Sequence, residues 1–268
     1  MHRIELGYRC NNACVFCGQG RLRELDPPPA DELEAKVDEL PPGVGVAFVG
    51  GEPTLSESLP RLIARARARG ARPVLVQTNG RRLAVAGYAA SLVAAGLDGL
   101  EVSLHGANAA MHDYHTGVED SFRQTVAGLR RASAERLRFV TTTVVTRSNF
   151  RHLTEIVRVA HALGARAARF DVVVEAGNAA RNAPRVVPAW PMLRPHLARA
   201  VELAHGLALE CVAPALGVDA TSAADWYAGP GVFEPVAAET PPGEVHVTLP
   251  LRRRALGALH GPIQGRSH

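Results

Sequence analysis

The chain has 268 residues, of which 47% are hydrophobic and 21% are charged, so we expect one large or two small folded domains and exclude a wholly disordered chain. Its net charge of +4 comes from scattered arginines, which gives no reason to expect a nucleic-acid partner. No apolar run is long enough to span a bilayer and the first residues lack the apolar core of a secretory signal, so we expect a cytoplasmic protein with no membrane partner.

Strand-like and helix-like segments alternate along most of the chain. Short apolar runs rich in β-branched residues predict strands at residues 3–8, 44–49, 73–77, 100–104, 137–145 and 168–174. Apolar residues at helical spacing, several of them closed by a glycine, predict helices at residues 31–40, 58–69, 83–95, 121–134 and 150–163. A further helix at residues 188–206 and a short seventh strand at residues 207–212 complete the pattern.

This alternation predicts an α/β fold: a partial TIM barrel of the (β/α)6 type, in which helices cover the outside of a parallel sheet. Residues 1–212 would form the barrel. Residues 213–268, in which proline, glycine and alanine predominate, would form an irregular C-terminal cover or tail. Because the chemistry of such barrels lies at the C-terminal ends of the strands, the residues that follow each strand are the candidates for a functional site.

Three of the four cysteines lie within eight residues, directly after the first predicted strand. Cys10, Cys14 and Cys17 have the spacing C-x3-C-x2-C, whereas Cys211 stands alone. Zinc sites usually require a fourth protein ligand, and neither His2 nor Cys211 has the paired spacing that is typical of one. Three thiolates on one loop better suit a four-iron cluster whose fourth iron is open to a small ligand.

The cysteine spacing, with Phe16 just before the last cysteine, resembles the signature of the radical S-adenosylmethionine (SAM) superfamily. Further motifs follow strands two, three and four in the order that this superfamily uses: Gly50-Gly51-Glu52-Pro53, Thr78-Asn79-Gly80 and Ser103-Leu104-His105-Gly106. Residues 112–122 resemble the segment that leads into the fourth helix of many members. The resemblance covers about residues 3–180.

The resemblance implies a [4Fe-4S] cluster on Cys10, Cys14 and Cys17, with SAM on the open iron. It also implies that SAM is cleaved reductively to a 5′-deoxyadenosyl radical, which takes a hydrogen atom from a peptide or small-molecule substrate in a modification or biosynthetic pathway. An electron donor such as flavodoxin or ferredoxin would be a partner. The residues implicated in holding SAM are Phe16, Gly50, Gly51, Glu52, Pro53, Thr78, Asn79, Ser103 and Thr116, the last of which stands where several members carry an arginine.

Several of these residues also have a purely structural interpretation. Phe16 could be a core aromatic residue, and the two glycines could simply make a sharp turn. Thr78 and Asn79 could cap the next helix.

Three other residues are candidate catalytic groups. We interpret residues 105–117 as a loop above strand four in which His105 and Tyr114 are candidates to face the substrate, since histidine transfers protons readily. Cys211 could donate a hydrogen atom to a substrate radical, as a lone cysteine does in some members of the superfamily, or it could fill the core.

Two functions of other kinds remain open. A non-catalytic iron–sulfur or zinc binding module would bind metal without cleaving SAM. An RNA-modifying radical SAM enzyme would be favoured by a basic surface that carries aromatic residues, and only 5% of this chain is aromatic.

Overall fold

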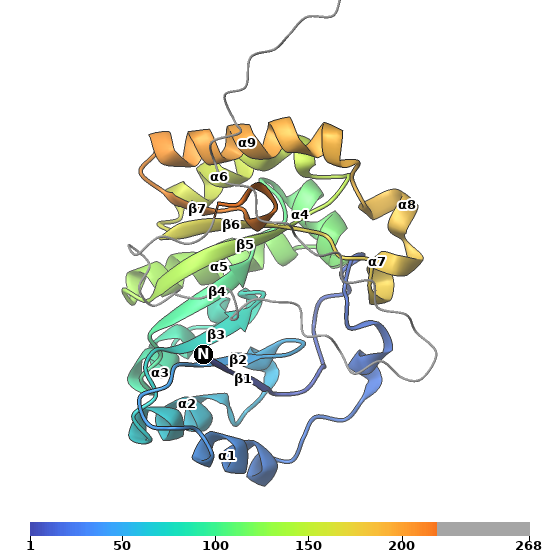
Figure 1. Ribbon diagram of the computed structural model, residues 1–268. Helices are drawn as coiled ribbons and strands as arrows, with labels where there is room; N and C mark the ends of the chain where they lie inside the picture. Colours follow the sequence, from blue (N-terminus) through green and yellow to red (C-terminus); the bar gives the residue numbers. More distant parts are fainter. Residues whose placement is uncertain (219–268) are drawn as a thin grey trace, which may run out of the picture.

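Seven parallel strands form one sheet whose spatial order follows the chain from β1 to β7. The computed structural model describes residues 1–218, and its helices lie outside the curved sheet (Figure 1). The strands are β1 (His2–Glu5), β2 (Val46–Val49), β3 (Val74–Thr78), β4 (Gly99–Ser103), β5 (Arg138–Val145), β6 (Ala167–Val172) and β7 (Glu210–Val212). Because β1 and β7 stand at opposite ends of this order, the barrel is open. The α/β fold and the partial TIM barrel are confirmed, and β7 lies within the residues 207–212 where a short seventh strand was expected.

The connections between strands are helices and short 3-10 turns. The α-helices are α1 (Ala30–Asp38), α2 (Leu59–Ala68), α3 (Tyr88–Ala94), α4 (Ala109–Thr116), α5 (Ser121–Ala134), α6 (Leu153–Ala162), α7 (Gly177–Arg181), α8 (Ala183–Val186) and α9 (Trp190–Gly206). The 3-10 turns are η1 (Gly20–Glu24), η2 (Pro53–Leu55), η3 (Arg81–Ala84), η4 (Phe150–His152) and η5 (Pro214–Leu216). No described helix combines the length and the apolar character needed to cross a membrane.

The two faces of the sheet are built from different side chains, because successive strand residues point to opposite faces. Toward the helices the strands present large apolar residues such as Phe48, Phe139 and Phe170, which are fully buried. Burial of one such side chain contributes roughly 1.5–3 kcal/mol. The inner face carries a separate cluster of smaller residues, Ala47, Val49, Leu75, Val140, Ala167 and Val212. The helices are therefore fixed on the outer face, and the inner face is left for a site.

Two local predictions were wrong. The single helix predicted at residues 83–95 is the turn η3 followed by α3, because Gly87 between them adopts a left-handed φ of 77°. The predicted loop above strand four contains the helix α4, which Asn108 caps by accepting a hydrogen bond from the Met111 amide at 2.9 Å.

The predicted C-terminal cover or tail lies mostly outside the described residues. Of residues 213–268, the structure describes only those up to Val218, where a short turn is closed by a β-bridge between Ala213 and Val218.

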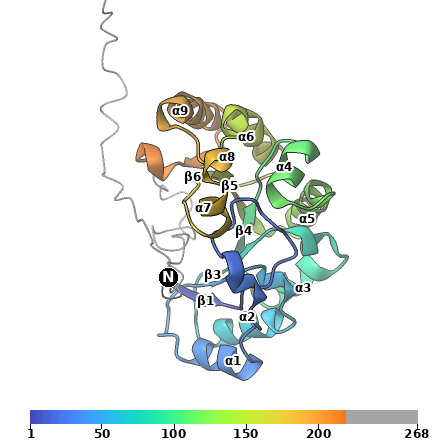
Figure 2. The same ribbon diagram turned by 90° about the vertical axis from the view of Figure 1, so that its right-hand side faces the viewer.

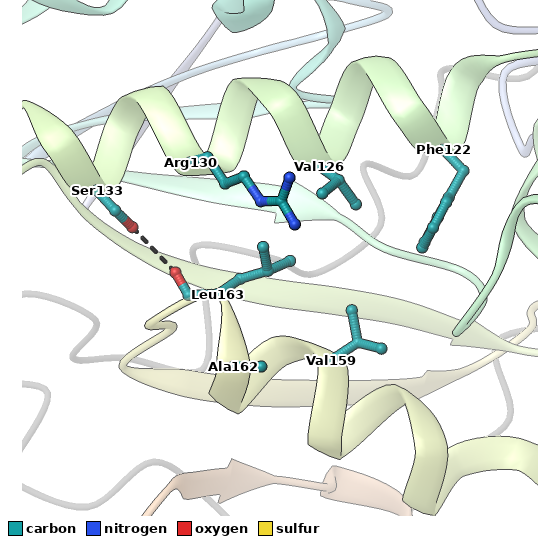
Figure 3. Close-up of a pocket in the computed structure, with 7 residues that line it drawn as sticks. All are labelled: Phe122, Val126, Arg130, Ser133, Val159, Ala162 and Leu163. Atoms are coloured by element: carbon teal, nitrogen blue, oxygen red, sulfur yellow. Dashed lines mark hydrogen bonds between the residues drawn. The ribbon is translucent and has the colours of Figure 1, made fainter.

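A groove of about 450 Å³ lies between α5 and α6 on the helix side of the sheet (Figure 3). Phe122 and Val126 from α5 and Val159 from α6 line it, and the Ser133 hydroxyl donates a hydrogen bond to the Leu163 carbonyl at 2.9 Å. Because α5 and α6 cover the outer face, the sheet separates this groove from the inner face of the barrel.

Candidate functional site

The three clustered cysteines lie on the cysteine loop (residues 9–19), which follows β1 at the C-terminal edge of the sheet. Figure 2 looks onto this edge and shows the loop running beside α7. All three thiols are half-buried and none forms a disulfide. Each of the thiols Cys10 and Cys14 has its pKa raised, first by burial and then in part by the charge of neighbouring cysteines, so the thiols lie close enough to interact.

The second half of the cysteine loop is held by α4 and α7. The amide of Ala13 donates to the carbonyl of Thr116 at 2.7 Å. From α7, Asn178 donates its amide to the Cys17 carbonyl at 2.8 Å and its side chain to the Cys14 carbonyl at 3.1 Å. The adjacent Asn182 side chain donates to the Val15 carbonyl at 3.1 Å. The loop backbone is therefore fixed by residues far from it in the sequence.

Two arginines hold the first half of the loop. Arg23 in η1 donates to the carbonyl oxygens of Cys10 and Asn12, the first at 3.0 Å. Arg81 in η3 donates to the Asn11 carbonyl and to the Asn12 side chain, the latter at 2.8 Å. Both guanidinium groups thus replace water as donors to a loop that has no regular hydrogen-bonding pattern of its own.

Glu52 connects the second and third motifs at the ends of β2 and β3. Its carboxylate is 3% exposed and accepts hydrogen bonds from the hydroxyls of Thr54 and Thr78, each at 2.6 Å, and from the Asn79 amide at 2.6 Å. Burial raises the pKa of Glu52, and these hydrogen bonds oppose that rise. The carboxylate is fully engaged by the chain's own donors, so it acts by positioning the loops around it.

Asn79 extends this network to the cysteines. Its side chain donates to Asn11 at 2.6 Å and, more weakly, to the Cys10 sulfur at 3.9 Å, and its oxygen accepts from the Arg81 amide at 3.0 Å. The alternative interpretation of Asn79 as a cap of the next turn is therefore compatible with a role beside the cysteine loop. The motifs that follow β1, β2 and β3 are joined by direct contacts.

The two glycines of the second motif serve close packing against the chain itself. Gly50 has a φ of 131°, and a side chain on Gly50 or Gly51 would overlap backbone oxygens of residues 7–9. The amides of Gly51 and Glu52 donate to the carbonyls of Gly7 and Arg9, each at 2.9 Å. Pro53 is buried and starts η2. The close approach expected toward a ligand is thus an approach to the segment that precedes the cysteines.

Ser103 and Thr116 differ in their availability to a ligand. Ser103 ends β4 on the inner face, and although its backbone pairs with β5, its hydroxyl makes no hydrogen bond with another described residue. Thr116 is fully buried, and its hydroxyl hydrogen-bonds Ser121 at 2.6 Å. That hydroxyl is enclosed by the chain itself, and the Thr116 carbonyl accepts from the Ala13 amide and so holds the cysteine loop.

Phe16 packs against a group of buried histidines. Its ring centroid lies 4.8 Å from that of His105 in an edge-on arrangement, and only 9% of the residue is exposed. Burial, together with the charges of His112 and His115, lowers the pKa of His105 well below its usual value. His105 accepts a hydrogen bond from the Val144 amide at 3.3 Å, so it lies inside the wall rather than facing an open loop.

Tyr114 and Cys211 lie away from the inner face. Tyr114 in α4 is 49% exposed and packs edge-on against His115. Cys211 in β7 is buried in the apolar cluster formed with α6 and α9, whereas its neighbour Val212 belongs to the inner cluster. Since adjacent strand residues point to opposite faces, Cys211 points toward the helices, which favours the alternative that it fills the core over a role as hydrogen donor.

A polar strip occupies the inner face above the small apolar cluster. It consists of Gln77, Glu101, Ser103, Thr142, Arg169 and Asp171, which lie on β3 to β6. The Oε1 atom of Glu101 accepts from the Thr142 hydroxyl at 2.5 Å, while its Oε2 atom is buried without a hydrogen-bond partner among the described residues. Burial raises the pKa of Glu101 to about 8. On β6, Arg169 donates to Asp171 at 2.6 Å.

The donor set of the cysteine loop suits an iron–sulfur cluster better than a single ion. Within residues 1–218, no three His, Cys, Asp or Glu side chains converge on one point as ligands of a single metal ion would. A four-iron cluster instead binds each thiolate to a different iron atom, which requires thiols that are near one another but separate. The amide of Asn12, 3.3 Å from the Cys10 sulfur, adds the kind of hydrogen bond that stabilises a thiolate ligand.

Sequence reasoning missed the residues that hold the cysteine loop. Asn178 and Asn182 lie more than 160 residues away from their partners, and nothing in the local sequence singles them out. Arg23 and Arg81 each stand a short distance after a recognised motif, which is the only signal that the sequence offered. Glu101 also carried a signal, since it is a charged residue in the middle of an otherwise apolar strand.

Comparisons with known proteins agree with this geometry. A family model described as the Radical SAM superfamily matches residues 4–160. The AdoMet-dependent heme synthase of Nitratidesulfovibrio vulgaris is 31% identical over 192 residues, which cover 69% of this chain and 51% of that protein. The probable GTP 3′,8-cyclase of Metallosphaera sedula is 31% identical over 169 residues, covering 60% of this chain and 52% of that protein. The chain thus spans about half the length of these relatives.

A solved structure shares the fold at lower identity. Streptococcus suis SuiB, bound to its precursor peptide SuiA, superposes with a TM-score of 0.62 at 15% identity, covering 79% of this chain and 49% of SuiB. This likeness concerns the arrangement of the strands and helices.

Proposed function

The chain belongs to the radical SAM superfamily, and from that membership we propose that it cleaves SAM reductively at a [4Fe-4S] cluster bound by Cys10, Cys14 and Cys17. When bound, the cluster would pass one electron to the SAM sulfonium, breaking the bond to C5′ and giving methionine and a 5′-deoxyadenosyl radical that takes a hydrogen atom from the substrate. The electron would come from a one-electron donor such as flavodoxin or ferredoxin.

The observation that carries this proposal is the direct contact between three motifs at one edge of the sheet. Asn79 touches both the Cys10 sulfur and the segment beside it, and its amide is held by Glu52. A binding module that only stored metal would need the cysteines but not this connection to the ends of β2 and β3. The connection supports a site in which the cysteines work together with the ends of β2 and β3.

The chain's own residues would position SAM and exclude water. Ser103, on the inner face with an unengaged hydroxyl, is available to a ribose or carboxylate oxygen. Phe16 and the buried histidines beside it give the loop an apolar wall, which would keep water away from a reactive radical. Glu52 would act through Thr78 and Asn79 by keeping the strand ends in place.

The polar strip favours the hypothesis that the substrate is polar, either a peptide or a small molecule. Its amide, hydroxyl, carboxyl and guanidinium groups are suited to hydrogen-bond a substrate with several heteroatoms and would leave a purely hydrocarbon chain unmatched. The names of the two relatives specify heme synthesis and a GTP cyclase, and SuiB was solved with a peptide. Both substrate classes therefore stay within the proposal.

The test is an anaerobic assay of SAM cleavage. The chain would be reconstituted with iron and sulfide, reduced with dithionite and given SAM, and 5′-deoxyadenosine would be measured by liquid chromatography. We expect 5′-deoxyadenosine from the wild-type chain and none from Cys14→Ala, which lacks a cluster ligand.

Cys211→Ala is the matched control, since it removes a thiol that points toward the helices. It should retain both its iron and the formation of 5′-deoxyadenosine. A wild-type chain that carries the full cluster yet forms no 5′-deoxyadenosine, even with cell extract as a source of substrate, would instead support the metal-binding module.

A further inference from the structure

Arg23 places a positive charge against the cysteine loop and has no carboxylate partner among the described residues. Its Nη2 atom donates to the carbonyls of Cys10 and Asn12. Its Nε atom is buried and has no acceptor within residues 1–218. A half-buried guanidinium group with only backbone oxygens as partners is costly, because its charge is partly desolvated and uncompensated.

The guanidinium group of Arg23 lies against the backbone of a residue that would bind the cluster, since it donates to the Cys10 carbonyl at 3.0 Å. The same Nη2 atom binds the carbonyls of Cys10 and Asn12, so the cation is held against the stretch of the loop that contains Cys10. Loading of the loop would turn these thiols into thiolates permanently, and reduction of the cluster would add one further negative charge to the same place. A fixed cation there stabilises the reduced state more than the oxidised state.

We propose that Arg23 is the charge-compensating and positioning residue of the cluster: it fixes the cysteine loop through two carbonyls and raises the reduction potential of the cluster. The inference deepens the proposed function and rests on it only in that the loop binds an iron–sulfur cluster. It holds whether or not SAM is cleaved.

Arg81 provides a natural comparison, because it holds the same loop through Asn11 and Asn12 and, among the described residues, makes no hydrogen bond to a cysteine. It donates to Asn11, to Asn12 and, at 2.8 Å through Nε, to Gln124. Asp120 lies close enough for the two charges to interact, so the charge of Arg81 is partly compensated by a carboxylate of the chain itself. Arg81 therefore contributes geometry, whereas Arg23 contributes geometry and charge.

The experiment is a redox titration of the reconstituted full chain, followed by electron paramagnetic resonance and carried out without SAM. Arg23→Gln should shift the midpoint potential to more negative values, because it removes the charge and keeps a hydrogen-bond donor. At the wild-type midpoint we expect the ratio of reduced to oxidised cluster to fall about tenfold, equivalent to a shift of about 59 mV. Arg21→Gln, which removes an exposed arginine from the same turn, should leave the midpoint unchanged.

Two further variants separate charge from geometry. Arg81→Gln should lower the iron content without moving the midpoint of the cluster that remains. Arg23→His carries a charge that is present at pH 6 and lost at pH 8.5, so its midpoint should depart from the wild-type value only at the higher pH. The proposal is overturned if Arg23→Gln or Arg23→His keeps the wild-type midpoint at pH 8.5, or if Arg81→Gln shifts it as far.

Discussion

At the scale of single residues, the buried carboxylate of Glu52 connects the chain segments that meet at the site. Glu52 accepts hydrogen bonds from its own turn and from the end of β3, and Asn79 passes the connection on to the cysteine loop. The sequence predicted Glu52 as part of a ligand-binding loop from its motif. It could not show that the donors of the chain itself satisfy the carboxylate, because Thr78 and Asn79 are more than 25 residues away.

Replacement of Glu52 should therefore lower the free energy of unfolding of the chain even when no ligand is bound. Glu52→Ala leaves the Thr78 hydroxyl and the Asn79 amide without their acceptor in a buried place, and we expect the free energy of unfolding to fall by about 3 kcal/mol. Urea denaturation followed by circular dichroism measures this loss. Glu57→Ala, at an exposed position five residues later, is the control and should change stability by less than about 0.5 kcal/mol. An equal effect of the two substitutions would contradict the role assigned to Glu52.

Glu101 should make stability depend on pH in the direction opposite to that of a salt-bridged acid. Burial raises its pKa from 4.5 to about 8, so the folded chain keeps a proton that the unfolded chain releases. The contribution of Glu101 is therefore fully present below pH 4.5 and is lost as the pH rises toward 8, by about 1.4 kcal/mol for each unit of pKa difference.

Glu101→Gln removes this dependence, because glutamine has no proton to release. Urea denaturation of both proteins at pH 5.5 and pH 8.5 should show the variant gaining stability relative to the wild type at the higher pH. A difference between the two proteins that stays constant across this range would refute the shifted pKa.

At the scale of elements, the cysteine loop gains its shape from helices rather than from its own residues. The bounds of α5 follow from apolar periodicity alone, and the sequence predicted them as residues 121–134. The helix α7 could not be predicted in this way, since five residues are too few to show a period. Its Asn178 acts through tertiary contacts with Cys14 and Cys17, which no local pattern encodes.

Gly117, which caps the end of α4, lies in close contact with the cysteine loop, so a substitution there shows whether this close approach matters. Gly117 has a φ of 66°, and an added Cβ would lie 2.6 Å from the Ala13 carbonyl oxygen. Gly87 has a similar φ of 77° but no neighbouring atom within 4 Å. Gly87→Ala should cost only the backbone strain of about 1–2 kcal/mol, whereas Gly117→Ala should cost more and displace the loop.

Thermal denaturation and iron content distinguish these two substitutions. We expect Gly117→Ala to bind less iron after reconstitution than Gly87→Ala does. Equal iron contents would show that the contact between Gly117 and Ala13 does not shape the site.

At the scale of the whole molecule, the order of the strands gathers the motifs at one edge. Parallel strands in chain order bring residues 10, 52, 79 and 103 to the same C-terminal edge, so the alternation of elements was enough to predict where the site lies. It was not enough to predict which face Cys211 occupies. That depends on the register of β7 against β6, in which Cys211 pairs with Ala168 of the helix-facing cluster.

Removal of iron should loosen α7, which holds the cysteine loop, more than it loosens the rest of the barrel. Hydrogen exchange of the reconstituted chain, compared with the chain treated with a chelator, should show faster exchange in α7 (Gly177–Arg181), because Asn178 binds the loop. Exchange in α1, which packs against α2 on the outer face, should not change. Equal acceleration in both helices would indicate global destabilisation instead of a local link.

The contacts of Asn178 also set an order of events during synthesis. The Cys17 carbonyl accepts a hydrogen bond from Asn178 in α7, and the Cys14 carbonyl accepts one from the side chain of the same residue, 164 residues after Cys14, as well as one from the Cys17 amide. A chain that leaves the ribosome from its N-terminus therefore exposes its three thiols long before the residues that shape them have been translated. Iron that reached the loop before α7 had been translated would therefore meet a loop whose backbone Asn178 does not yet hold.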